Sequence, residues 1–288
     1  AAPLHGCVAD ARLWQRTLRE QLGFDDVALL TDAQATRAGI LQALGDLLRT
    51  SRRGDVVVFQ YAGHGTTVPD VDRDEGDAND EALVPVDYAG GAFLVDDDLR
   101  AAFDRTPAGV AVTCFMDCCH SGTITRVLAG GPPAPRADAG DGPRARYLDL
   151  LSQAPEALAA YVALRLGAPA GETPDGARAV GGTAAGTREA MRTVLYSACL
   201  STEVAYEQNG QGDFTRLATP LLRDAVRDAA THVEFRRRVI AAFGATPRQH
   251  PTLDCAPSRR TGRLLHPVAA PAARAAEAAE AAESAAAP

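Results

Sequence analysis

Runs of apolar, β-prone residues alternate along the chain with segments in which apolar residues recur at helical spacing. Two uninterrupted runs, 55–61 (DVVVFQY) and 109–116 (GVAVTCFM), are typical of buried strands, and residues 192–199 form a third run of this kind. A short strand is predicted at 27–30, and helices are predicted at 10–22, 36–50, 96–103, 148–166, 214–229 and 231–243. This alternation predicts an α/β fold with a mostly parallel central sheet flanked by helices.

Three stretches lack such a pattern. Residues 129–146 are rich in Gly, Pro, Ala and Arg and are predicted to be a flexible linker, and residues 167–187 are again loop-like. Residues 267–288 are an Ala-, Pro- and Glu-rich segment of low complexity, which predicts a solvated tail.

Composition narrows the classes of partner. The 288 residues carry a formal net charge of -8, and because phosphate binding needs a basic surface, nucleic acid is not expected to be a partner. No apolar stretch reaches the roughly 18 residues of a membrane span, so no membrane contact is expected. The six cysteines are spread over a long chain, which favours reduced thiols and a cytoplasmic location. Nothing in the sequence indicates an organic cofactor.

Reactive side chains follow the ends of two predicted strands. His64 lies between two glycines, which allow a sharp turn that leaves the imidazole exposed, and Cys119 follows the strand that ends near Met116. Because ligands bind at the carboxyl edge of a parallel sheet, we expect this thiol and imidazole to meet there as nucleophile and base. The backbone amides of Gly65 and Cys119, with Gly122 nearby, are candidates for an oxyanion site.

The other thiols are predicted to be packing residues. Cys114 and Cys199 lie within predicted strands, and Cys118 points away from Cys119 on an extended chain, so only one of the two neighbours can face the cleft. A zinc site is not expected, because adjacent Cys118, Cys119 and His120 do not have the spacing of tetrahedral ligands.

Two short segments resemble the signatures of the metacaspases, the caspase-like cysteine peptidases of bacteria, plants, fungi and protists. They are residues 61–65 (YAGHG) and 117–122 (DCCHSG), and the 55 residues between His64 and Cys119 match the established caspase spacing of about 50. The similarity covers about residues 4–128 and 192–254. It extends to 6–10 (GCVAD), the acidic residues of 70–75, 80–88 (DEALVPVDY), 95–99 (VDDDL), 197–199 (SAC) and 204–207 (VAYE).

The resemblance implies a caspase–haemoglobinase fold and peptide-bond hydrolysis. Cys119 would be the nucleophile and His64 the general base and acid of a cysteine-type endopeptidase. The family cuts after Arg or Lys, and Asp10 and Asp117 match its substrate-binding acids, so peptides or proteins with a basic P1 residue are the expected partners. By the same resemblance, calcium is the one cofactor suggested, and Asp80, Asp96 and Asp97 are its candidate ligands.

The chain departs from the family pattern at three places. Arg126 stands where many members carry an acid, and Ala62 replaces a frequent Ser. The family's first strand normally precedes the GCVAD segment, and here only Ala1 to His5 do so, which suggests that the first strand is missing. A core strand lost in this way would expose its neighbours and lower stability.

The resemblance also divides the chain. Residues 1–128 correspond to a p20-like catalytic region, 129–191 to a linker or insertion, 192–266 to a p10-like region of the same domain, and 267–288 to the tail. The arginines of the linker, among them Arg144 and Arg146, make self-cleavage there chemically possible, but an uncut insertion is equally compatible with the sequence. A monomer is expected, as for related type I metacaspases.

The main alternative is a catalytically silent, caspase-like scaffold or interaction domain. The presence of both Cys119 and His64 argues against it, because a protein without activity usually loses one of the two. A different cysteine hydrolase or transferase on a similar sheet is a further possibility that a substrate panel would test.

Overall fold

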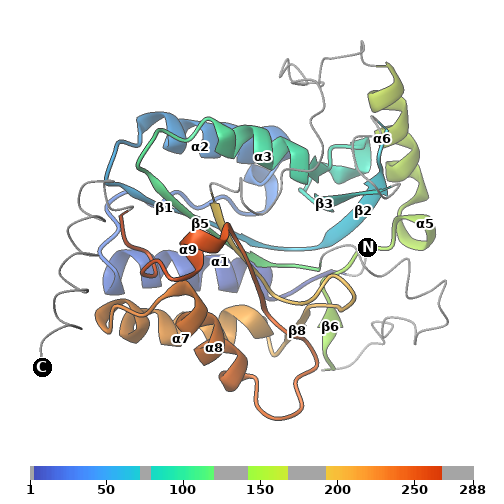
Figure 1. Cartoon of the computed structure of the whole chain (residues 1–288). Helices are drawn as coiled ribbons and strands as arrows, with labels where there is room; N and C mark the ends of the chain where they lie inside the picture. Colours follow the sequence, from blue (N-terminus) through green and yellow to red (C-terminus); the bar gives the residue numbers. More distant parts are fainter. Residues whose placement is uncertain (1–2, 72–78, 120–141, 168–192, 268–288) are drawn as a thin grey trace, which may run out of the picture.

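The core of the protein is a four-stranded sheet. The computed structural model describes residues 3–71, 79–119, 142–167 and 193–267. In the sheet order β1-β5-β7-β10, the first three strands are parallel and the last is antiparallel to β7. The bounds are β1 (Val56–Ala62), β5 (Ala111–Asp117), β7 (Thr193–Ser197) and β10 (Thr252–Asp254). The three strands predicted from the apolar runs are therefore confirmed, and they lie side by side (Figure 1). Only β5 is buried throughout; β1, at the edge of the sheet, is mostly half-buried, so its predicted burial is wrong.

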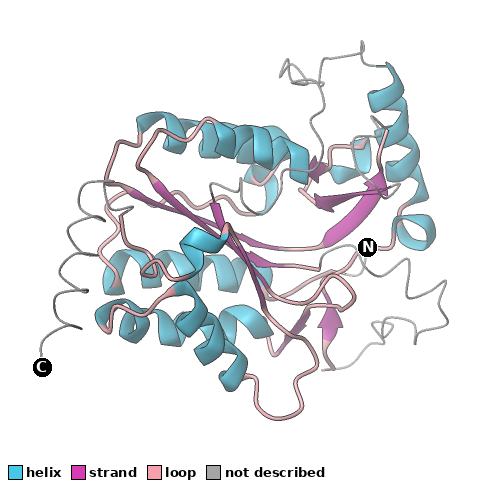
Figure 2. Cartoon of the chain, in the orientation of Figure 1, coloured by secondary structure: helices cyan, strands magenta, loops and turns pink. Residues whose placement is uncertain are grey.

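Helices cover both faces of this sheet (Figure 2). One face packs against α1 (Cys7–Arg16), α7 (Asp213–Arg227) and α8 (His232–Ala242). The other face packs against α2 (Arg37–Thr50) and α3 (Asp96–Asp104). The predicted α/β sheet flanked by helices is thus confirmed.

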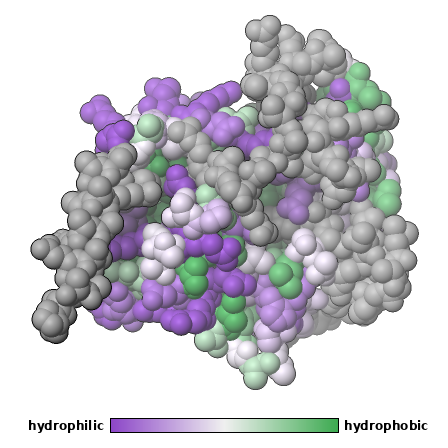
Figure 3. Space-filling view, in the orientation of Figure 1, coloured by the Kyte–Doolittle hydropathy of each residue, from purple (hydrophilic) through white to green (hydrophobic). Residues whose placement is uncertain are grey.

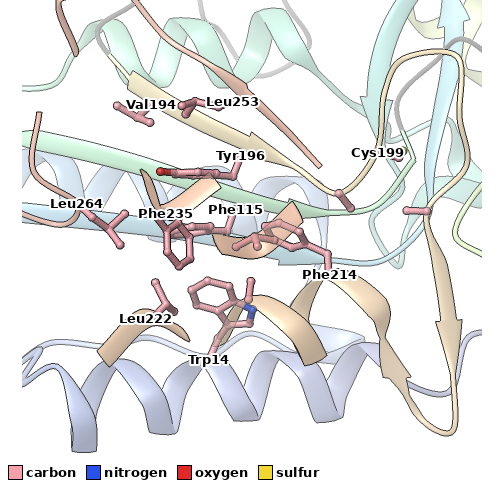
Figure 4. Close-up of a cluster of buried hydrophobic side chains, with 14 of the residues drawn as sticks. Trp14, Phe115, Val194, Tyr196, Cys199, Phe214, Leu222, Phe235, Leu253 and Leu264 are labelled. Atoms are coloured by element: carbon pink, nitrogen blue, oxygen red, sulfur yellow. The ribbon is translucent and has the colours of Figure 1, made fainter. Parts of the chain in front are cut away.

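The side chains of β5 alternate between the two cores, as the pleat of a strand requires. Phe115 stacks on Tyr196 at 5.0 Å between ring centroids and lies 4.5 Å from Trp14 of α1 (Figure 4). Cys114 and Met116 point to the opposite face and pack with the residues of α2 and α3. All seven residues of β5 are buried, so this strand forms the centre of the fold.

Two small antiparallel sheets extend the molecule at the carboxyl ends of β1 and β5. The first contains β2 (Gly65–Pro69), β3 (Asn79–Leu83) and β4 (Leu94–Val95). The second contains β6 (Arg144–Ala145), β8 (Tyr206–Gln208) and β9 (Gln211–Gly212). Among the described residues, the remaining α-helices are α5 (Leu150–Gln153), α6 (Pro155–Gly167) and α9 (Pro257–Arg260), and 3-10 turns are found at Asp32–Gln34 and Tyr88–Gly90.

Some predicted elements are corrected. The strand at 27–30 is wrong: these residues have no regular structure, and they line an apolar cavity of about 800 Å³ beside β1, the outer strand of the sheet. The helix at 10–22 begins earlier, at Cys7, and its end is the π-helical turn Thr17–Gln21. The helix at 148–166 is divided into α5 and α6 just before Pro155, because the residue before a proline is disfavoured in helical geometry.

The predicted linker 129–146 is built into the fold at its end. Arg144 and Ala145 form β6, and Arg146 is completely buried. Most of that linker, Arg126, the segment 168–192 and the tail from 268 onward lie outside the described residues.

The surface of the molecule is mixed in polarity on the face that Figure 3 shows. On the face seen in Figure 3, the coloured surface is a mixture of hydrophilic and smaller hydrophobic areas. Within the residues that the structure describes, no helix has the length and apolar character needed to cross a bilayer.

Candidate active site

The parallel register of β1 and β5 brings the predicted nucleophile and base to one edge of the sheet. Ala62 is paired with Asp117, so the residues that follow each strand, His64 and Cys119, leave the sheet next to each other. Gly65 is in direct contact with this second strand end, because a Cβ there would lie 1.8 Å from the carbonyl oxygen of Cys119. A residue with any side chain would push the two strand ends apart.

The turn that carries His64 is fixed by Tyr61. The Tyr61 hydroxyl donates to the His64 carbonyl at 3.0 Å, and the same carbonyl accepts the N–H of Val84 at 3.1 Å. Gly63 makes this possible, since a Cβ at that position would lie 2.4 Å from the Tyr61 hydroxyl oxygen. The two glycines around His64 therefore allow close packing: Gly63 leaves room for the Tyr61 hydroxyl, and Gly65 for the backbone of Cys119.

Cys119 is buried and hydrogen-bonded through its sulfur. Its Sγ accepts the N–H of Ala205 at 3.1 Å, and its side chain is 1% exposed. Burial is the main cause that raises the pKa of the Cys119 thiol well above 9.0, and neighbouring Cys199 adds to this effect. In this arrangement the sulfur is protonated at neutral pH, whereas the reactive form of a cysteine is the thiolate.

The amides of Gly65 and Cys119 converge on one oxygen atom. Both donate to the carbonyl oxygen of Arg146, at 3.0 Å and 3.3 Å respectively. Two backbone N–H groups aimed at one carbonyl oxygen beside a nucleophile are the arrangement of an oxyanion hole. The structure thus brings together the two amides that sequence analysis selected, and it also shows what they bind.

A buried acidic pocket holds the side chain of Arg146. Its guanidinium forms ion pairs with Asp10, with Asp117 at 3.2 Å and with Glu207 at 3.4 Å. Each of these four side chains is at most 3% exposed. Arg146 also donates to the Asp117 carbonyl at 2.9 Å. Asp10 and Asp117, selected from the sequence, therefore face the same guanidinium.

The walls of the pocket come from segments far apart in the sequence. Asp10 lies on α1, Asp117 ends β5, and Glu207 lies on β8. Gly212 closes the pocket: its N–H donates to Asp10 at 3.0 Å, and a Cβ there would lie 2.3 Å from an oxygen of Asp117. Burial raises the pKa of Asp10 to about 7, while the charge of Arg146 opposes this rise.

Sequence analysis gave no role to Glu207 and placed no arginine in the acidic pocket. Glu207 was part of the VAYE match, and Arg146 was one of several arginines in the predicted linker. The signal available was indirect: a guanidinium can be buried only among carboxylates, but nothing in the sequence says which arginine reaches which acid.

The acids suggested for calcium lie apart from this pocket. Asp80 is buried on β3, and Asp96 and Asp97 open α3. Burial, together with Asp97 and Glu81, raises the pKa of Asp96 to about 7, and Asp97 forms an ion pair with Arg100. In the described part of the chain, no group of three or more His, Cys, Asp or Glu side chains is placed to hold a metal ion. Calcium dependence stays a prediction.

Comparisons with known proteins show what the first part of the chain is similar to. Residues 1–128 match the family model described as "Metacaspase, peptidase C14 domain". This part of the chain is therefore similar to a metacaspase peptidase domain. The chain is 37% identical over 129 residues to Metacaspase-1 of Coccidioides immitis and 39% identical over 132 residues to Metacaspase-1 of Cryptococcus neoformans.

The similarity to these two metacaspases covers only part of each protein. The matched segments are 42% and 43% of this chain, but only 28% and 29% of the two relatives, so the chain spans less than a third of their length. The match of the metacaspase family model also ends before Arg146 and Glu207.

A solved structure matches almost the whole chain. The crystal structure of protein GSU0716 from Geobacter sulfurreducens has a TM-score of 0.69 and 23% sequence identity, and the match covers 93% of this chain and 92% of that one. This likeness concerns the fold. Together with the sheet order, it supports the predicted α/β architecture, a mostly parallel sheet flanked by helices.

Proposed function

We propose that the chain is a cysteine-type endopeptidase that cleaves after Arg or Lys, with Cys119 as nucleophile and His64 as general base and acid. The match of residues 1–128 to a metacaspase peptidase domain supports peptide-bond hydrolysis as the class of reaction. The observation that carries the specificity is the pocket of Asp10, Asp117 and Glu207, which holds a guanidinium beside Cys119. A buried acidic pocket selects a basic P1 side chain, because a neutral one would leave the carboxylates unpaired.

The chemistry follows from the groups at the sheet edge. His64 takes the proton of the Cys119 thiol, and the thiolate attacks the carbonyl carbon of the P1 residue. The amides of Gly65 and Cys119 stabilise the negative charge that forms on the carbonyl oxygen. His64 then gives its proton to the leaving amine, and water hydrolyses the thioester to release the P1 carboxylate and restore the thiol.

The substrate would bind as an added β-strand. The edge of β8 accepts an antiparallel partner, and Ala205 presents a carbonyl to the N–H of the P1 residue, as it does for Arg146 at 2.8 Å. Main-chain hydrogen bonds of this kind give affinity for many sequences, while the acidic pocket selects the side chain.

The test is hydrolysis of a fluorogenic peptide with Arg at P1, compared with matched peptides that carry Lys, Asp or norleucine. We expect turnover of the Arg and Lys peptides by the wild type and none by Cys119→Ala. Equal rates for the two proteins would reject Cys119 as nucleophile. Preference for Asp or norleucine would reject the pocket. If no peptide is cut and a peptidyl electrophile does not label Cys119, the silent scaffold is the better interpretation.

A further inference from the structure

The loop that joins β7 to β8, residues 198–205, brings two polar groups of Ala205 to the candidate active site. The Ala205 N–H donates to the sulfur of Cys119 at 3.1 Å, and the Ala205 carbonyl accepts the N–H of Arg146 at 2.8 Å. Ala205 is completely buried, although residues 198–205 contain neither helix nor strand. The position of Ala205 therefore depends on contacts that reach the loop from other segments.

The side chain of Gln249 joins the two ends of this loop. Its Nε2 donates to the carbonyl of Ala198 at 2.9 Å, where the loop begins. Its Oε1 accepts the N–H of Tyr206 at 2.9 Å, at the first residue beyond the loop. Gln249 is completely buried, so one amide group uses a donor and an acceptor on the loop away from competing water.

We propose that Gln249 is a positioning residue of the peptidase: it holds the peptide group between Ala205 and Tyr206, so that Ala205 faces both the nucleophile and the substrate. This inference rests on the proposed function and adds a residue to the same site. The two hydrogen bonds of Gln249 go to main-chain groups, so it acts through the loop and not on the reacting atoms.

The peptide group between Ala205 and Tyr206 transmits the effect to the substrate. The Ala205 carbonyl and the Tyr206 N–H belong to one planar unit and point in opposite directions. Gln249 binds the N–H side of this plane, while the carbonyl side faces the position given above to the N–H of the P1 residue. A rotation of the plane would break the Gln249 bond and turn the carbonyl away from the substrate.

The loop also carries the group that donates to the nucleophile. Burial raises the pKa of the Cys119 thiol well above 9.0, and the hydrogen bond from the Ala205 N–H acts in the opposite direction. The direction is expected, because a hydrogen bond to a thiolate favours the charged form. If Gln249 releases the loop, this donor moves away from the sulfur, and the reactive thiolate forms less readily.

The neighbours of Gln249 contact the same part of the chain. The guanidinium of Arg248 lies 5.3 Å from the ring centre of Tyr206. The N–H of His250 donates to the side chain of Glu203, within the loop, at 2.7 Å. Three consecutive residues therefore hold the loop and the start of β8, and Gln249 is the buried one of the three.

The first experiment removes the amide while keeping a side chain of similar length. We expect Gln249→Met to lower kcat and raise KM for the P1-Arg fluorogenic peptide, with kcat/KM reduced by about 10- to 100-fold, because both groups of Ala205 are displaced. Labelling with a peptidyl electrophile counts the active molecules. His250→Gln is the matched control: its ring is exposed, and its main-chain bond to Glu203 is retained, so kcat/KM should stay within about twofold of the wild type.

Gln249→Glu separates positioning from a loss of stability, because each measurement is made on one protein at different pH. A protonated carboxyl can accept the Tyr206 N–H and donate to the Ala198 carbonyl, as the amide does, whereas an ionised carboxyl has no proton to donate. Activity relative to the wild type should therefore be highest at about pH 5.5 and fall by about 10-fold toward pH 8 as the new carboxyl ionises. A ratio that is constant over this range would overturn the positioning role.

The outcomes separate this inference from the proposed function. A lower melting temperature for Gln249→Met with wild-type kcat and KM would show that Gln249 only stabilises the fold. If the wild type cuts no peptide, the endopeptidase assignment fails, and the loop is tested alone by alkylation of Cys119 with iodoacetamide, followed by mass spectrometry. The pH of half-maximal alkylation rate should then be about one unit higher in Gln249→Met than in the wild type. Equal values would overturn the proposed link from Gln249 to the nucleophile.

Discussion

Gly65 and Cys119 touch through their backbones, and this contact aligns the two halves of the candidate active site. A Cβ on Gly65 would lie 1.8 Å from the Cys119 carbonyl oxygen, so any side chain must separate the ends of β1 and β5. The Gly65 amide would also move away from the oxyanion site, where it now donates to Arg146 at 3.0 Å.

We expect Gly65→Ala to lower kcat for a P1-Arg peptide by about 10²–10³-fold, the usual cost of a lost oxyanion donor. The matched control is Gly45→Ala on α2, where an added Cβ meets nothing within 4 Å. That change should leave turnover intact and stabilise the protein by about 0.5–1 kcal/mol, because Ala is the better helix former. Steady-state kinetics and urea unfolding of both variants provide the check. Wild-type kcat in Gly65→Ala would contradict the assignment of the oxyanion site.

The adjacent thiols Cys118 and Cys119 should respond differently to substitution. Cys118 is completely buried in the core against α2 and α3, whereas the sulfur of Cys119 is bonded to Ala205 at the candidate site. We expect Cys118→Ala to keep measurable turnover and to lose roughly 1–2 kcal/mol of unfolding free energy through the small cavity it leaves. Cys119→Ala should lose all turnover with little change in stability. Loss of turnover in a well-folded Cys118→Ala protein would show that Cys119 is the wrong choice of nucleophile.

The sequence allowed three of the four strands of the central sheet to be predicted, because these three are continuous apolar runs bounded by glycines and polar residues, whereas β10 is only three residues long. Residues 55–61 and 109–116 became β1 and β5 within two residues at each end. The segment 27–30 was misassigned for the same reason: it is short and apolar, but it lines a cavity instead of pairing with β1. Apolar character alone does not distinguish a strand from a buried loop of that length.

That His64 and Cys119 follow neighbouring strand ends at one edge of the sheet was expected from parallel strand topology, which a sequence pattern can indicate. The third carboxyl group of the pocket could not be predicted in this way. Glu207 joins Asp10 and Asp117 around Arg146 only because β8 folds back across the sheet edge. There its carboxylate also accepts the N–H groups of His5 and Gly6, which lie about 200 residues earlier in the chain. Arg146 was placed in a linker by composition, and its burial depends on charges supplied by all three distant segments.

The pH dependence of P1-Arg cleavage should report Asp10. Its pKa is raised from 3.8 to about 7, chiefly by burial, while the cation in the pocket opposes the rise. When the pocket is empty this opposing effect is absent, so the pKa should rise further. We therefore expect kcat/KM, which reports the free enzyme, to increase with pH through an inflection above about 7 as Asp10 ionises.

Asp10→Asn is the variant that tests this assignment. It removes one carboxylate from the pocket and should lower kcat/KM for Arg peptides by about 10-fold or more, since charge-assisted hydrogen bonds are each worth about 1.5–3 kcal/mol. It should also remove the inflection assigned to Asp10, while any ionisation of His64 remains in the profile. An unchanged pH profile in Asp10→Asn would exclude Asp10 as its source.

The stability of the fold at acid pH should depend on His232, which is far from the chemistry. His232 is buried, its Nδ1 lies 2.9 Å from the Tyr196 hydroxyl oxygen, and burial together with Arg259 lowers its pKa from 6.5 to about 4. The folded protein therefore binds fewer protons here than the unfolded chain between these two values. The contribution that His232 makes through this lowered pKa to the free energy of unfolding is fully present above about pH 6.5. It is lost as the pH falls toward 4.

From the size of that shift we expect a loss of about 3 kcal/mol of unfolding free energy on acidification, at about 1.4 kcal/mol per pH unit. Urea unfolding of the inactive Cys119→Ala protein between pH 7 and 4 measures the slope without self-cleavage. Adding His232→Gln should flatten the slope, because glutamine does not titrate, although the protein will be less stable at pH 7 if the Tyr196 contact is not replaced. His250 provides the matched control, since its exposed ring is paired with Glu203 on the surface. If His250→Gln flattened the slope and His232→Gln did not, the acid sensitivity would come from the surface pair and not from the buried imidazole.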